Sequence, residues 1–179
     1  MKPTEFMQEN AILDLIEGMA QNLTNQLQDR QINDPVMIGI HTGGVWVAEK
    51  LHDQLGIEEP LGTLNISFYR DDFSRIGLNP TVKPSSIPFD IDDRHIILVD
   101  DVLQTGRTIR AAMNEIFDFG RPASITFCAL IERSGRELPI EASVVGMKPS
   151  IQNNDYISLT GPSPLQLMIG KPAKDGDSN

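Results

Sequence analysis

The stretch from residue 96 to residue 108 restricts the possible folds of this chain more than any other part of the sequence. It begins with four apolar residues, continues with Asp100 and Asp101, and then reaches a turn that contains Gly106. A short apolar run that ends in turn residues predicts a buried strand. The helical spacing of apolar residues over 107–119 predicts a helix, which a Gly-Arg-Pro sequence ends. A buried strand that passes directly into a helix is typical of α/β domains.

The rest of the chain repeats this alternation of strands and helices. Apolar runs too short for a helix predict strands, and apolar residues at helical spacing predict helices. The predicted strands are residues 36–40, 61–68, 95–99, 124–131 and 142–145, and the predicted helices are residues 12–30, 45–55 and 107–119. This order predicts an α/β fold of one domain, with a mainly parallel central sheet flanked by helices. A chain of 179 residues is long enough to bury the core of such a domain.

Composition excludes several classes of protein. The formal charge of -10 argues against a general binder of polyanions, because nucleic-acid affinity depends largely on clustered Lys and Arg. The single cysteine, Cys128, follows apolar residues, which predicts a buried and reduced thiol in a reducing compartment. The N-terminus lacks the apolar core of a signal peptide, and no apolar run approaches the roughly 18 to 20 residues of a membrane span. We therefore expect a cytoplasmic protein without membrane contact.

The two aspartates and the turn after them predict a ligand site, because ligands of open α/β sheets bind where the strands end. Thr105, Gly106 and Thr108 lie where a helix begins, and free N–H groups, the helix dipole and hydroxyl donors there suit a phosphate. Asp100 and Asp101 lie within reach of the hydroxyls of a sugar that carries this phosphate, and stabilise positive charge on its ring. For the aspartates alone a solvated acidic helix cap is the alternative, but the strand and turn around them favour a ligand site.

Several motifs give the sequence a family resemblance. Residues 96–108 resemble the signature for phosphoribosyl pyrophosphate (PRPP) in type I phosphoribosyltransferases. Further motifs are residues 39–44 (GIHTGG), 68–72 (FYRDD), 99–103 (VDDVL), 120–122 (GRP) and 136–140 (RELPI). Together they resemble the PyrR family, pyrimidine-operon regulators that are also uracil phosphoribosyltransferases. The resemblance is clear over residues 38–146 and weaker outside them.

The resemblance implies transfer of a phosphoribosyl group from Mg-bound PRPP to N1 of uracil, which yields UMP and pyrophosphate. The Mg is carried by PRPP oxygens and water, and we assign no protein ligand to it. The implied catalytic residues are Asp100, Asp101 and Arg70. The implied PRPP-binding residues are Thr42, Gly43, Gly44, Leu103, Gln104, Thr105, Gly106, Arg107 and Thr108. The implied uracil-binding residues are Ile131, Arg133 and Arg136, with the base beneath residues 131–139.

The single domain of residues 1–179 has four further parts in this interpretation. Residues 1–34 contain the N-terminal helix, and residues 131–146 form a small hood. Residues 70–88 form a long loop with several prolines, which closes over the transition state and excludes water. Residues 171–179 form a polar tail that frays.

Two positions depart from the pattern of related enzymes. Gly43 stands where members of this layout often have Arg, and loss of that cation weakens the grip on pyrophosphate and lowers the rate. Gln104 stands where purine phosphoribosyltransferases usually carry an Asp that exchanges a proton with the purine ring. Because Gln does no acid-base work, this position favours a pyrimidine substrate.

Two alternatives remain open, an RNA-binding attenuator that responds to uridine nucleotides and a low-activity regulatory subunit on the same fold. The intact aspartates favour the enzyme over the regulatory subunit, although Gly43 keeps the latter open. In PyrR regulators, RNA binds a basic face formed by the N-terminal helix and segments near the C-terminus. Here residues 1–34 hold two basic and six acidic residues, and residues 141–179 hold three and four. Such a face repels an RNA backbone, so we expect no tight RNA binding. We also expect a homo-oligomer.

Overall fold

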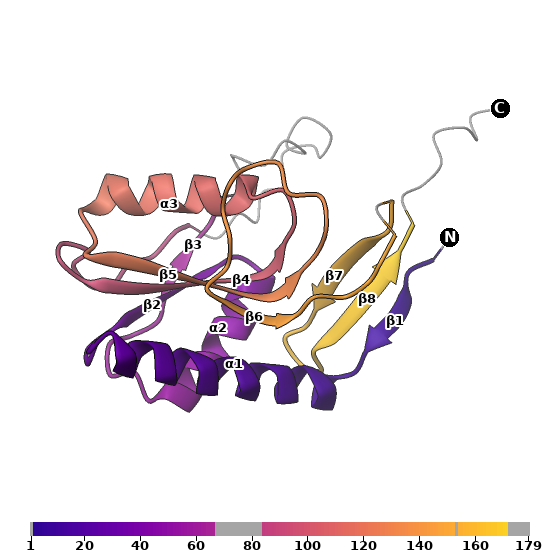
Figure 1. Cartoon of the computed structure of the whole chain (residues 1–179), viewed down its shortest axis with the longest axis horizontal. Helices are drawn as coiled ribbons and strands as arrows, with labels where there is room; N and C mark the ends of the chain where they lie inside the picture. The colour runs from indigo at the N-terminus through magenta and orange to yellow at the C-terminus, as the bar shows by residue number, and fades with distance from the viewer. Residues whose placement is uncertain (1, 67–83, 153, 172–179) are drawn as a thin grey trace.

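The computed structural model describes residues 2–66, 84–152 and 154–171 (Figure 1). In chain order the elements are β1 (Thr4–Met7), α1 (Glu9–Asp29), β2 (Val36–Ile40), α2 (Gly43–Leu55), β3 (Gly62–Leu64), β4 (His95–Leu103), α3 (Arg107–Phe119), β5 (Ser124–Glu132), β6 (Val144–Met147), β7 (Tyr156–Thr160) and β8 (Gln166–Gly170). Most of the predicted loop at 70–88, with Arg70, lies outside the described residues, as does the predicted tail after Lys171.

The central sheet has the strand order β3-β2-β4-β5-β6, and all its neighbouring strands are parallel. β4 lies in the middle, and helices cover both of its faces (Figure 1). Its side chains alternate, so Ile97 and Val99 pack with α1 and α2, whereas Ile96 and Leu98 pack with α3. The predicted α/β fold, a parallel sheet between helices, is therefore confirmed.

The helices bury one stripe each, as the sequence period requires. On α1 the buried residues are Ile12, Ile16, Met19, Ala20, Leu23 and Leu27. The neighbouring strand β5 contributes Cys128 to the same core, and burial raises the pKa of this thiol to about 12. Within the described residues, no helix has the length and apolar character needed to cross a membrane.

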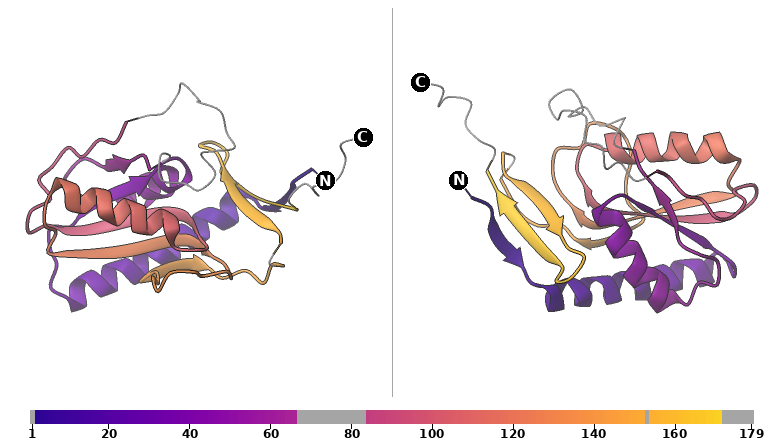
Figure 2. Two further views of the ribbon diagram at one scale, coloured as in Figure 1. Left: turned by 90° about the horizontal axis from the view of Figure 1, so that it is seen from above. Right: turned by 180° about the vertical axis from the view of Figure 1, so that it is seen from behind.

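A second, antiparallel sheet in the order β1-β8-β7 joins the two ends of the chain (Figures 1 and 2). None of these three strands is predicted from the sequence. The predicted strand at residues 142–145 is β6 (Val144–Met147), which lies in the central sheet beside β5, so the end of the predicted hood at 131–146 belongs to that sheet. The small sheet is instead built from both chain ends, and its strand β7 approaches the carboxyl end of β4.

Candidate active site

The link between β4 and α3 lies at the carboxyl edge of the central sheet, and we call residues 103–108 the phosphate loop. Gly106 has a φ of 92°, which residues other than glycine rarely adopt. A Cβ at this position would lie 3.3 Å from Leu138 Cβ. α3 has no acidic residue in its first turn and no side-chain cap. Its first N–H bond runs from Arg110 to Gly106 O at 3.0 Å, so the N–H groups of Thr108 and Ile109 have no partner within the helix. This helix start suits an anion.

Two hydroxyls support the phosphate loop. Thr105 Oγ1 accepts a hydrogen bond from Arg107 N at 3.2 Å, which leaves the hydroxyl hydrogen of Thr105 able to donate. Thr108 is half-buried in the first turn of α3 and lines the same cavity as Thr105. Both threonines therefore present a hydroxyl at the wall of this cavity.

The predicted acidic residues lie in the carboxyl-terminal half of β4, just before this loop. Asp100 is only 3% exposed, and its Oδ1 accepts a hydrogen bond from Asp101 N at 3.0 Å. Asp101 is half-buried, and its Oδ1 accepts a hydrogen bond from Val102 N at 3.0 Å. These backbone donors fix the orientation of both carboxylates at the sheet edge.

The predicted pyrophosphate-binding residues 42–44 follow the neighbouring strand β2, which pairs with β4 in parallel, so they lie at the same edge of the sheet as the aspartates. The His41–Thr42 peptide bond is cis, and α2 begins at Gly43. The two glycines allow close packing on the acidic residues. A Cβ on Gly43 would lie 2.3 Å from Asp101 Oδ2, and a Cβ on Gly44 would lie 2.7 Å from Val99 O. The starts of α2 and α3 therefore lie on either side of the aspartates.

A cavity of about 690 Å³ lies over the acidic residues and the phosphate loop. Its wall includes Glu137, Ile157 and Ser158, which the sequence analysis does not single out. Glu137 Oε2 accepts a hydrogen bond from Arg107 Nε at 2.7 Å, which makes the two side chains an ion pair. Residues 156–160 alternate in burial along β7, and the matching alternation of polar and apolar side chains in the sequence was the signal for a strand here.

The predicted uracil-binding residues do not form one group. Ile131 is fully buried in the core that α1 covers, so the structure gives its side chain a packing role, unlike the prediction. Arg133 is 5% exposed and donates a hydrogen bond to the Asp155 carbonyl. Arg136 reaches the phosphate loop, where its Nη1 donates to Gln104 O at 2.6 Å. Arg133 and Arg136 both line a cavity of about 620 Å³.

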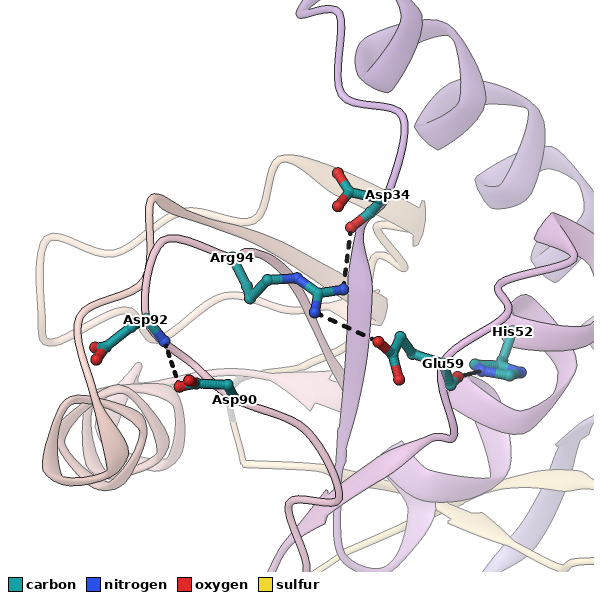
Figure 3. A network of polar contacts seen from close by, with 6 residues as sticks. All are labelled: Asp34, His52, Glu59, Asp90, Asp92 and Arg94. Atoms are coloured by element: carbon teal, nitrogen blue, oxygen red, sulfur yellow. Dashed lines mark hydrogen bonds and ion pairs between the residues drawn. The ribbon is translucent and has the colours of Figure 1, made fainter.

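A larger cavity of about 790 Å³ lies at the opposite edge of the sheet, where β2 and β4 begin. Arg94 there donates to Asp34 O at 3.5 Å and to Glu59 Oε1 at 3.4 Å, and His52 Nε2 lies 2.7 Å from Glu59 O (Figure 3). Ligands of α/β sheets bind where strands end, not where they begin. We therefore locate the candidate active site at the cavity beside Asp100, although its volume is smaller.

Comparison with known proteins identifies the family of the chain. The family model described as "Phosphoribosyl transferase domain" matches residues 4–162. "Bifunctional protein PyrR" of Nitrosococcus oceani is 59% identical over 157 residues, which cover 87% of this chain and 89% of the relative. The protein of the same name from Pseudomonas aeruginosa is 54% identical over 154 residues, which cover 86% of this chain and 91% of the relative.

A solved structure shares the fold at low sequence identity. The hypoxanthine-guanine phosphoribosyltransferase of Bacillus anthracis superposes with a TM-score of 0.66 and 18% identity, over 84% of this chain and 86% of that chain. The predicted phosphoribosyltransferase fold is therefore confirmed. The matched domain model and the relatives at more than half identity show that the chain belongs to the PyrR family of phosphoribosyltransferases.

Proposed function

We propose that this chain is a uracil phosphoribosyltransferase, which converts uracil and PRPP into UMP and pyrophosphate. The position of Asp100 and Asp101 between the starts of α2 and α3 carries the proposal. Two helix starts suit two phosphate groups, and carboxylates between them suit the hydroxyls of a ribose. Membership of the PyrR family supports this reaction.

In this proposal the phosphate loop binds the 5-phosphate of PRPP. The N–H groups of Thr108 and Ile109 and the hydroxyls of Thr105 and Thr108 donate to it. The pyrophosphate lies at the start of α2, along residues 42–44. Leu103, Gln104 and Gly106 shape the loop around the ligand, while Arg107 adds a cation beside the phosphate.

The acidic residues act on the ribose. Asp100 and Asp101 accept hydrogen bonds from its hydroxyls and stabilise the positive charge that develops on the ring. The bond from C1 to the pyrophosphate oxygen breaks as uracil N1 bonds to C1. The electrons of the broken bond leave with pyrophosphate, and the proton of N1 passes to the leaving pyrophosphate. Because the backbone N–H groups of the next residues already hold both carboxylates, little reorganisation is needed when the charge appears.

The site also fits Mg carried by PRPP. The cavity wall holds three acidic residues, Asp100, Asp101 and Glu137, but only one basic residue, Arg107, among the residues that the structure describes. These residues therefore offer little positive charge to balance a polyphosphate. Mg prefers carboxylate and phosphate oxygens and keeps several waters. In the part of the chain that the structure describes, no group of three or more His, Cys, Asp or Glu side chains is placed to hold a metal ion. When bound, Mg would neutralise charge on the pyrophosphate, and Asp100 and Asp101 are the residues that would lie beside it.

The base is proposed to lie near residues 131–139, which we call the base segment. Gln104 faces this segment, because its Nε2 would lie 3.3 Å from a Cβ on Gly135. An amide in this position offers a donor and an acceptor but no proton exchange, which suits a pyrimidine better than a purine.

The test is formation of UMP by the purified chain with PRPP, Mg and uracil, measured by chromatography. Hypoxanthine and guanine serve as competing acceptors, and a reaction without PRPP serves as the control. We expect UMP, with faster turnover of uracil than of either purine. No UMP from a folded protein would refute the proposed reaction, whereas faster turnover of a purine would refute the role of Gln104.

A regulatory role is the second candidate, because the relatives are named bifunctional proteins. The acidic N-terminal and C-terminal segments argue against a tight RNA complex, since phosphate contacts supply much of RNA affinity. We expect no tight binding of a pyrimidine-leader hairpin at about 0.15 M salt, with or without UMP. A specific nanomolar complex in a filter-binding assay would make the attenuator the better hypothesis. The cytoplasmic location and the homo-oligomer stay predictions.

A further inference from the structure

The base segment holds the carbonyl side of the phosphate loop at three successive positions. Leu103 O accepts a hydrogen bond from the backbone N of Arg133 at 3.0 Å. Thr105 O accepts two, from the backbone N of Glu137 at 3.0 Å and of Leu138 at 3.1 Å. The carbonyl between them, Gln104 O, is held by a side chain.

That side chain is Arg136, whose guanidinium joins two parts of the site. Its Nη1 donates to Gln104 O at 2.6 Å, and its Nη2 donates to Glu132 Oε1 at 2.8 Å at the end of β5. The side chains of Arg136 and Glu132 are only 24% and 17% exposed. Lys148 also pairs with Glu132, at 3.1 Å, but its side chain is 68% exposed. Arg136 thus makes the less exposed of the two ion pairs of Glu132.

These contacts orient the phosphate loop. In a planar trans peptide the C=O and the next N–H point in opposite directions. With Gln104 O and Thr105 O held toward the base segment, the N–H groups of Thr105 and Gly106 point away from it. Both residues line the cavity beside Asp100. The hydrogen bonds to the carbonyls therefore fix which way the loop donors point before a ligand arrives.

We propose that Arg136 is a positioning residue for PRPP, which holds the phosphate loop in its binding conformation from the base segment, and that it does not contact uracil. The inference rests on the proposed function, because it takes the loop to bind the 5-phosphate. It also links the two substrate sites, since the segment expected to lie over the base is the one that holds the loop. The Nη1 and Nη2 atoms of Arg136 each donate a hydrogen bond to a group of the protein itself.

The test is PRPP affinity without uracil, measured by calorimetry in the presence of Mg, for Arg136→Gln and Arg136→Lys. We expect about tenfold weaker PRPP binding for Arg136→Gln, because a charged hydrogen bond to Gln104 O is lost. Arg136→Lys should be intermediate, because an ammonium cannot span both partners. Lys148→Gln is the matched control, which removes the other cation from Glu132 and should change the affinity by less than about twofold. The KM for uracil at saturating PRPP should stay close to that of the wild type.

Unchanged PRPP affinity with a raised KM for uracil would overturn the inference and return Arg136 to the uracil site. If thermal melting shows that Arg136→Gln is unfolded, Arg136→Lys decides by the same comparison. Lys148→Gln could also lose as much PRPP affinity as Arg136→Gln. This result would overturn the inference, because the loss would then come from the unpaired charge of Glu132 and not from the hydrogen bond to Gln104 O. A wild-type chain that binds PRPP but forms no UMP would refute the proposed reaction and leave this comparison of affinities intact.

Discussion

Replacement of Gly43 by alanine should disturb the active site by steric contact. A Cβ at this position would lie 2.3 Å from Asp101 Oδ2, 2.6 Å from Cγ and 2.9 Å from Cβ of the same residue. Ordinary contact begins at 3.4 Å, so the Asp101 carboxylate must move by about 1 Å. This movement would disturb the hydrogen bond that Asp101 accepts from Val102 N.

The size of the effect follows from this displacement. A misplacement of about 1 Å in a reacting arrangement can reduce a rate by up to about a hundredfold. Asp101 is half-buried and able to rotate in part, so we expect Gly43→Ala to lower kcat by about tenfold to a hundredfold. The free energy of unfolding should fall by about 1–3 kcal/mol, the range for an added methyl group in a packed site, because Asp101 Cβ would also lie only 2.9 Å away.

Gly43→Arg separates this steric effect from the cation that related enzymes often carry here. If charge at this position strengthens pyrophosphate binding, the Arg variant should recover activity relative to Ala, but both should remain below the wild type. UMP formation at saturating substrates gives kcat, and calorimetry gives the affinity for PRPP.

The control is Gly18→Ala in α1, where a Cβ meets nothing within 4 Å. It should keep full activity and gain roughly 0.5–1 kcal/mol of stability. Wild-type kcat in Gly43→Ala would refute the reasoning.

Three further predictions concern the aspartates, the phosphate loop and the buried cysteine. Asp101→Asn keeps its shape but loses its charge, so kcat should fall by about 10- to 1000-fold, and near-normal turnover of the folded variant would remove Asp101 from the mechanism. Replacement of Thr105 and Thr108 by Val removes two hydroxyl donors and should weaken PRPP binding, whereas unchanged affinity in calorimetry would place the phosphate elsewhere. Cys128, whose pKa burial raises from 9.0 to about 12, should react with thiol reagents at pH 8 only after unfolding. Above pH 9 its thiol ionises in the unfolded chain alone, so its contribution to stability should decline between pH 9 and 12.

The parts of the fold that the sequence predicts are those set by local patterns. β4 and α3 follow each other directly, and each has the apolar spacing of its own period, so the phosphate loop between them could be placed without knowledge of the rest. The parallel neighbours follow from the same alternation. Because β2 and β4 pair in parallel, their carboxyl ends lie at the same edge, which brings residues 42–44 to the aspartates.

The parts that the sequence does not predict depend on pairing between distant segments. β1 is a strand because it pairs with β8, more than 150 residues away, and its four residues alone are too few to reveal an alternating pattern. The role of Arg136 is hidden for the same reason. Its motif identifies the family, but its partner is a backbone carbonyl 32 residues earlier, and every residue type presents a carbonyl. A charged residue within a ligand-binding motif therefore need not contact the ligand. A guanidinium can equally well hold the backbone whose N–H groups make the contact.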